Sequence, residues 1–214
     1  MLRRVLLVCG IISPVLYIGT DILAATMLYK GYSYTAQQVS ELSAIGAPTR
    51  PLWIAMTSAW TALVIAFAIG VRLSAGPKRS LRVTAALLVA FGFVGLLWVL
   101  FAPMHPPGTV GLAGDISHLV FAGVQVLLMV AFMALGSSAA GRGFRIYSIA
   151  TLVATLVFGA LPSTQAAAIA AGQPTPWWGL IERVAVYAPV LWVLVFAVVL
   201  LRQRSALQSQ TASE

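Results

Sequence analysis

The sequence predicts an all-α polytopic membrane protein, a helical bundle of six transmembrane helices with both termini cytoplasmic. Its composition, its long apolar segments and the placement of its basic residues lead to this fold class. Of the 214 residues, 60% are hydrophobic and 8% are charged, whereas a soluble domain carries about 25% charged residues. So few charges cannot cover a water-exposed surface. Lipid is the remaining solvent, and in lipid a helix satisfies its own backbone hydrogen bonds.

Six segments approach the length of about 20 apolar residues that a helix needs to cross the hydrocarbon layer. The first follows Arg3-Arg4 and is too long for the apolar region of a signal peptide, so we interpret it as an uncleaved span. The second follows Pro51, which suits a first helical turn. The fifth is the shortest. The expected spans are residues 5–29, 52–71, 81–101, 116–136, 146–161 and 177–201.

The basic residues set the expected orientation. Ten of the 13 lie at alternate ends of the six spans, and such an excess of Lys and Arg marks the cytoplasmic side. We therefore interpret the net charge of +8 as residues that set the membrane orientation and lie beside anionic lipid headgroups, rather than as a nucleic-acid-binding surface. The ten residues are Arg3, Arg4, Arg72, Lys78, Arg79, Arg82, Arg142, Arg145, Arg202 and Arg204.

The remaining segments complete the expected organisation. Residues 1–204 form one transmembrane domain, and residues 205–214 form a disordered cytoplasmic tail. In the first outer loop, residues 34–44 have the composition of a short helix lying on the membrane surface. Four tryptophans are expected at the outer headgroup level, where amphipathic rings are enriched. They are Trp53, Trp98, Trp177 and Trp178.

Two adjacent charged residues lie inside the last expected span. Glu182 and Arg183 lie about 8 Å below the outer interface at 1.5 Å per residue. Adjacent helical residues do not face each other, so each needs a partner from another helix. For Arg183 the candidates are Asp21 and Asp115. For Glu182 they are Arg50, His118 or a tyrosine hydroxyl. Asp21 itself is either solvated at the outer interface or part of this polar cluster, which also includes Tyr187.

The two histidines lie near the same side. Asp115 and His118 share a helix face at spacing i, i+3, and His105 lies in the preceding loop. Two histidines and a carboxylate are possible zinc ligands with an open position, although the spacing matches no familiar zinc motif. The alternative is a helix cap beside a histidine. Glu41, between Ser40 and Ser43, either covers the cluster or is solvated.

Five short stretches resemble the domain-of-unknown-function family 998, which consists of small multi-pass bacterial membrane proteins. The resemblance implies a location in the bacterial inner membrane and no established activity. Membrane zinc hydrolases of the ceramidase and adiponectin-receptor type use three histidines, one more than this chain contains. The stretches are Gly31-Tyr32-Ser33, Ser40-Glu41-Leu42-Ser43-Ala44, Pro103-Met104-His105, His118 and Gly179-Leu180-Ile181-Glu182-Arg183.

Three functions remain open, and we favour a non-enzymatic one. In the first, an outer-half polar cluster binds a small molecule, a lipid headgroup or an ion. In the second, the protein is a structural or accessory membrane subunit. In the third, it is a metal-dependent hydrolase with His105, Asp115 and His118 as zinc ligands and Glu182 or Asp21 as general base. The candidate cluster is Asp21, Glu41, Arg50, His105, Asp115, His118, Glu182, Arg183 and Tyr187.

Overall fold

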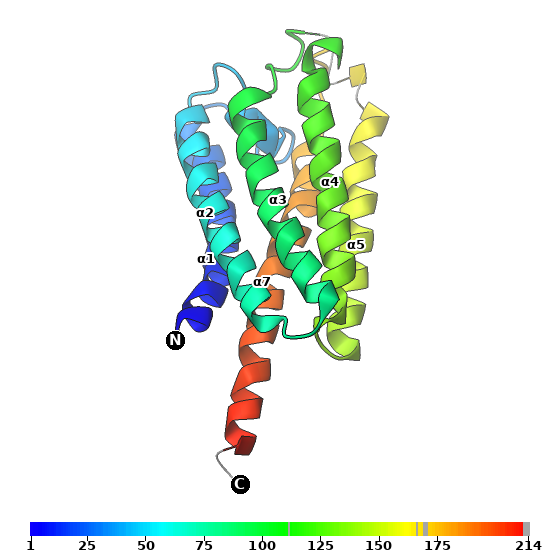
Figure 1. Cartoon of the computed structure of the whole chain (residues 1–214). Coiled ribbons are helices and arrows are strands. Elements are labelled where there is room, and N and C mark those ends of the chain that lie inside the picture. Colours follow the sequence, from blue (N-terminus) through cyan, green and yellow to red (C-terminus); the bar gives the residue numbers. More distant parts are fainter. Residues whose placement is uncertain (111, 166, 169–170, 212–214) are drawn as a thin grey trace.

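The computed structural model describes the chain except residues 111, 166, 169–170 and 212–214. In this described part all regular elements are helices, and six of them are long and apolar enough to cross a membrane. The predicted all-α bundle of six transmembrane helices is therefore confirmed (Figure 1). The six are α1 (Leu2–Leu23), α2 (Arg50–Ser74), α3 (Arg79–Phe101), α4 (Ile116–Gly136), α5 (Arg142–Ala160) and α7 (Trp178–Thr211).

The helix ends differ from the predicted spans in an understandable way. α2, α3 and α5 each begin at an arginine, because a helix can continue past the apolar stretch that identifies it in the sequence. α1 continues into a π-helical turn, η1 (Ala24–Leu28). α7 continues to Thr211, so the expected disordered tail begins within this helix, and its last three residues lie outside the described part.

One local prediction is wrong. The expected surface helix over residues 34–44 is only a short 3-10 helix, η2 (Val39–Ser43). Residues 34–37 form turns instead. Their backbone carbonyls are taken by side-chain donors rather than by helical N–H groups: Tyr32 donates to Gln37, and Arg183 donates to Tyr34 and Gln37. Side-chain bonds of this kind compete with helix formation.

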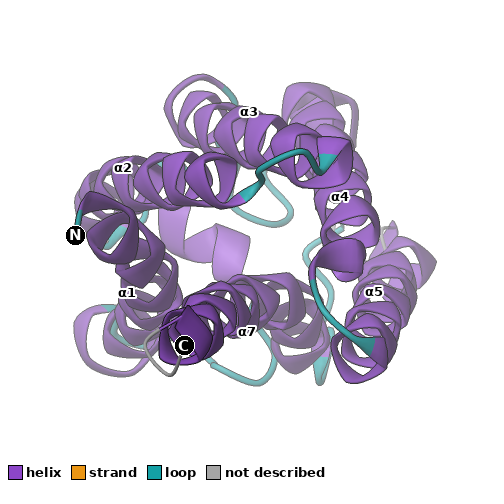
Figure 2. Cartoon of the chain, turned by 60° about the horizontal axis from the view of Figure 1, so that its bottom comes forward, coloured by secondary structure: helices purple, strands orange, loops and turns teal. Residues whose placement is uncertain are grey.

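The helices form a ring in which chain neighbours pack together. α1, α2, α3 and α4 pack in succession, and α7 lies against both α1 and α5. Figure 2 shows this arrangement from the end where the termini lie. α4 makes few contacts with α5 and α7, so this side of the ring is the least closely packed. Buried aromatic rings fill much of the centre, among them Phe67, Phe132, Trp192 and Phe196.

Both chain termini lie at one end of the bundle, which we call the terminal end (Figure 1). The opposite, distal end carries the three longer connections, over residues 29–49, 102–115 and 161–177. The basic residues expected on one side lie in the end turns of α1, α2, α3 and α5, in the turn before α3, and in the C-terminal third of α7, which points to the terminal end. The carboxylates of α1 and α7 lie toward the distal end.

The tryptophans that we expect at the outer headgroup level differ widely in exposure. Trp177 is 63% exposed, whereas Trp53 is 5% and Trp178 is 3% exposed. Sequence position fixes the level of a residue along a helix axis but not the direction in which its side chain points. Trp53 and Trp178 therefore contribute to the interior of the bundle.

Candidate functional site

A buried ion pair joins α1 to α7 near the distal end. Arg183 donates from Nε to Oδ2 of Asp21 and from Nη2 to Oδ1, each at 2.9 Å. Asp21 is 0% and Arg183 is 2% exposed. Such a two-point contact between guanidinium and carboxylate is strong and directional. The predicted pairing of Arg183 with Asp21 is therefore the one that the structure contains, and Tyr187 also donates its hydroxyl to Asp21.

The other donors of Arg183 bind the first distal loop. Nη1 donates to the carbonyl oxygens of Tyr34 at 2.7 Å and Gln37 at 3.1 Å, and it also reaches Gly179 of its own helix at 3.1 Å. Nη2 donates to the Tyr32 hydroxyl at 2.9 Å. All five N–H groups of the guanidinium thus have acceptors within the protein. Arg183 has no donor left for a ligand.

Two tyrosines complete this network. The guanidinium carbon of Arg183 lies 3.7 Å from the centre of the Tyr34 ring, which is a cation–π contact. Burial raises the pKa of the Tyr32 hydroxyl, so that group stays protonated, and its single hydrogen is shared between the carbonyls of Gln37 and Gln38. We call the set of Asp21, Tyr32, Tyr34, Arg183 and Tyr187 the distal staple, because it fixes the loop to both helices.

The distal staple also requires a glycine. A Cβ atom on Gly179 would lie 2.1 Å from the carbonyl oxygen of Gln37 and 2.7 Å from that of Tyr34. The first turn of α7 therefore contacts the loop backbone directly, and Leu180 N–H donates to Thr35 at 3.2 Å. In the sequence, Gly179 belongs to one of the stretches that carry the family resemblance.

Glu182 points away from this network. Its Oε2 accepts a hydrogen bond from the backbone N–H of Val39 at 2.5 Å. In the part of the chain that the structure describes, no Lys, Arg or His nitrogen pairs with it within 4.0 Å. The partners expected for Glu182 were Arg50, His118 or a tyrosine hydroxyl, and the hydrogen bond observed is to a backbone group instead. Neighbouring residues on α7 thus have different surroundings: Arg183 is fully paired, and Glu182 is not.

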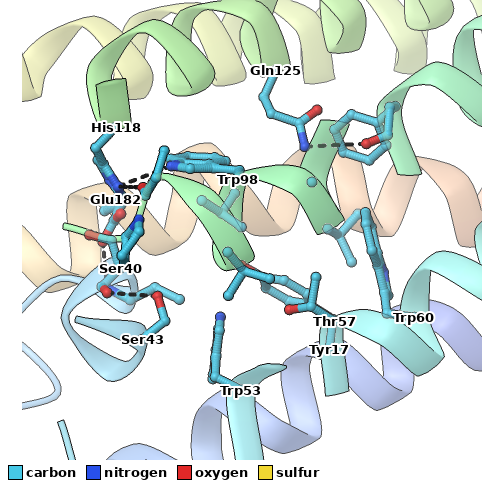
Figure 3. Close-up of a pocket in the computed structure, with 18 of the residues that line it drawn as sticks. Tyr17, Ser40, Ser43, Trp53, Thr57, Trp60, Trp98, His118, Gln125 and Glu182 are labelled. Carbon is cyan, nitrogen blue, oxygen red and sulfur yellow. Dashed lines mark hydrogen bonds between the residues drawn. The ribbon is translucent and has the colours of Figure 1, made fainter. Parts of the chain in front are cut away.

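Glu182 lines a cavity of about 140 Å³ inside the distal half of the ring. Aromatic rings form much of its wall: Tyr17, Trp53, Trp60, Phe91 and Trp98. Figure 3 shows Glu182, His118, Ser40 and Ser43 at one end, Trp60 and Gln125 at the other, and Trp53, Trp98, Tyr17 and Thr57 between them. The cavity is therefore mainly apolar, with its single carboxylate at the loop end.

Two further polar side chains in the wall are incompletely satisfied. Nδ1 of His118 lies 3.0 Å from Nε1 of Trp98 and 3.1 Å from the Ala102 carbonyl oxygen, so it accepts from one or donates to the other according to the tautomer. Either arrangement leaves Nε2 for another partner. Gln125 donates to the Phe91 carbonyl at 3.3 Å, and its buried Oε1 has no hydrogen-bond partner among the described residues.

The remaining candidate residues form separate local contacts. Glu41 accepts from the Gln38 N–H at 2.9 Å and from the Gln37 amide at 2.7 Å, which stabilises the start of η2. Arg50 donates to the carbonyls of Ser43 at 2.5 Å and Val99 at 3.2 Å. The nine predicted residues are thus divided among several contacts rather than joined in one cluster.

The proposed zinc ligands are likewise divided. Nδ1 of His105 lies 2.9 Å from Asp115 Oδ1, which also accepts from the His105 backbone N–H at 3.0 Å. His118 contacts Trp98 and Ala102 instead. Across the described residues, no group of three or more His, Cys, Asp or Glu side chains is arranged to hold a metal ion. The structure therefore does not assemble the ligand set His105, Asp115 and His118.

The fold and these contacts define a class: a six-helix integral membrane protein with a paired buried arginine and a separate aromatic-lined cavity. The chain belongs to the family described as protein of unknown function DUF998, whose model matches residues 11–199. No curated protein and no solved structure matches the chain. The family assignment agrees with the sequence resemblance and brings no activity with it.

Proposed function

We propose that this membrane protein is non-enzymatic and binds a small molecule in the cavity beside Glu182. The observation that carries the proposal is the contrast between adjacent residues of α7. Arg183 has acceptors for all its donors. Glu182 accepts from the Val39 N–H, lies beside the Ser40 hydroxyl and faces the cavity without a cationic partner among the described residues. An ionisable side chain inside a membrane protein is costly and usually marks a functional site.

The cavity wall supports this proposal over a purely structural role. Pockets for small molecules are lined mainly by apolar and aromatic side chains, with a few polar groups that orient the ligand. Glu182, His118 and Gln125 provide such groups at the two ends of the aromatic wall. A cluster that served only to join helices would leave neither the space nor the unpartnered Gln125 oxygen.

A filling substitution tests the binding proposal. Thr57 lines the cavity, and the next residue, Ser58, is exposed on the outer surface of α2. We expect native mass spectrometry of gently extracted protein to show a retained small molecule in the wild type and in Ser58→Phe, but not in Thr57→Phe. No retained molecule in the wild type, or equal retention in a folded Thr57→Phe variant, would contradict the proposal.

We further propose that the protein lies in the bacterial inner membrane with its terminal end in the cytoplasm. The ten basic residues at that end support this orientation. In a Cys9→Ser background, we expect a membrane-impermeant maleimide to label Lys30→Cys, in the distal loop, on intact cells. Lys78→Cys, in an exposed turn at the terminal end, should react only after the cells are opened. The reverse labelling pattern would contradict the orientation.

A further inference from the structure

We propose that the group bound in the cavity is a small organic ammonium, with Glu182 as its counterion. This inference rests on the proposed binding function and specifies the chemistry of the ligand. Three features of the site carry it: the charge balance, the aromatic wall and the size of the space.

Among the described residues, no cationic side chain lies within 4.0 Å of the Glu182 carboxylate to balance its charge. Asp21 and Arg183 neutralise each other in a bidentate pair that is closed to further partners. Arg50, the nearby cation of α2, donates to the Ser43 and Val99 carbonyls and is not part of the cavity wall. A carboxylate in such surroundings is strongly stabilised by a cation that enters beside it, because little water competes there.

The aromatic wall favours an organic cation over a metal ion. The negative faces of Trp, Tyr and Phe rings attract ammonium groups, and cages of such rings bind quaternary ammonium ligands. Here five rings line one cavity, with Tyr17 packed edge-on against Trp53 and Trp60 against Phe91. Calcium or magnesium would instead need several oxygen ligands, and Glu182 is the single carboxylate in the wall.

The size of the cavity limits what can enter. Its volume of about 140 Å³ is close to the roughly 150 Å³ of an engineered cavity that holds benzene. A trimethylammonium group with a short substituent is of this size, whereas a drug-sized molecule needs a pocket of about 300 Å³ or more. The cavity therefore fits an ammonium headgroup or a small free amine.

The position of the cavity allows the ammonium group to come either from a lipid headgroup or from a free amine in solution. Its wall extends along α3 from Phe91 to Ala102, which is about 16 Å at 1.5 Å per residue. Ser40 and Ser43 of the first distal loop lie at its end beside Glu182. A solute from the distal water phase and the headgroup of a distal-leaflet lipid both meet the protein at this level.

Choline and its neutral carbon analogue 3,3-dimethylbutan-1-ol form a matched pair of probes for this proposal. We expect calorimetry on protein in phosphatidylglycerol nanodiscs to show choline binding at least tenfold tighter than the analogue. Glu182→Gln should weaken choline binding at least tenfold and leave the analogue unchanged. Asp115→Asn, which alters a carboxylate outside the cavity wall, should leave both affinities unchanged.

The possible results distinguish a failure of the ammonium proposal from a failure of the proposed binding function. Equal affinity for the two probes in the wild type would overturn the ammonium proposal and leave the cavity as a binding site, even if Glu182→Gln fails to fold. Binding of neither probe would overturn the ammonium proposal, and would overturn the binding function as well if no molecule is retained in native mass spectra. Nanodiscs of phosphatidylcholine then distinguish the sources: weaker choline binding in them identifies a lipid headgroup, and unchanged binding identifies a free amine.

Discussion

Replacing Arg183 by methionine should lower the free energy of unfolding by about 3–5 kcal/mol, because breaking a buried ion pair leaves an uncompensated charge. The charge left behind is Asp21, whose side chain is fully buried. Arg183→Met also removes the donors to Tyr34 and Gln37, so the first distal loop should detach from α7. Unfolding of the purified protein in mixed micelles measures the loss of stability.

The double variant Asp21→Leu/Arg183→Met provides the control for this result. It removes both charges, and an apolar pair of similar volume is often as stable as a buried ion pair. We therefore expect the double variant to recover much of the stability that Arg183→Met loses. If the single variant costs less than about 1 kcal/mol, the range of an exposed ion pair, the buried staple does not exist.

The second large effect is expected at Gly179. A methyl group there meets two backbone carbonyl oxygens, of Gln37 and Tyr34, rather than a flexible side chain. The first turn of α7 and the loop must therefore move apart in Gly179→Ala, which strains or breaks the contacts of Arg183. We expect a loss of about 1–3 kcal/mol, the usual range for overpacking, together with faster proteolysis of residues 31–49.

Gly123 of α4 is the matched control for Gly179. It is also a helical glycine, but a Cβ atom there would have no neighbour within 4 Å. Gly123→Ala should leave stability unchanged or raise it slightly, because alanine favours a helix over glycine. Equal stability of Gly123→Ala and Gly179→Ala would show that α7 does not contact the loop as closely as described.

The sequence predicts the spans, and it limits the partner of Arg183 to two carboxylates, for clear physical reasons. Apolar length identifies the six helices, and α4 has the predicted bounds. An arginine within a span needs a carboxylate from another helix, which left Asp21 and Asp115 as candidates, and the structure contains the pair with Asp21. These predictions depend on position along a helix axis, which the sequence contains directly.

The partner of Glu182 and the cavity could not be predicted in this way. Glu182 accepts a hydrogen bond from the backbone N–H of Val39, at the start of the short 3-10 helix η2, and a backbone N–H group leaves no mark in the sequence. The spacing of Asp115 and His118 suggested that both side chains face the same site, but they do not. Asp115 ends the 3-10 turn η3 (Leu112–Asp115) and binds His105. His118 contacts Trp98 of α3 instead. The cavity depends on how five helices and a loop pack together.

We infer a division of the distal polar groups into the closed distal staple and an open binding cavity. A crystal structure grown in a lipid mesophase with choline tests it most directly. The expected map shows the Asp21–Arg183 pair intact and added density between Glu182 and the rings of Trp53 and Trp98. A collapsed cavity, with Glu182 paired to a cationic side chain of the protein, would contradict the account.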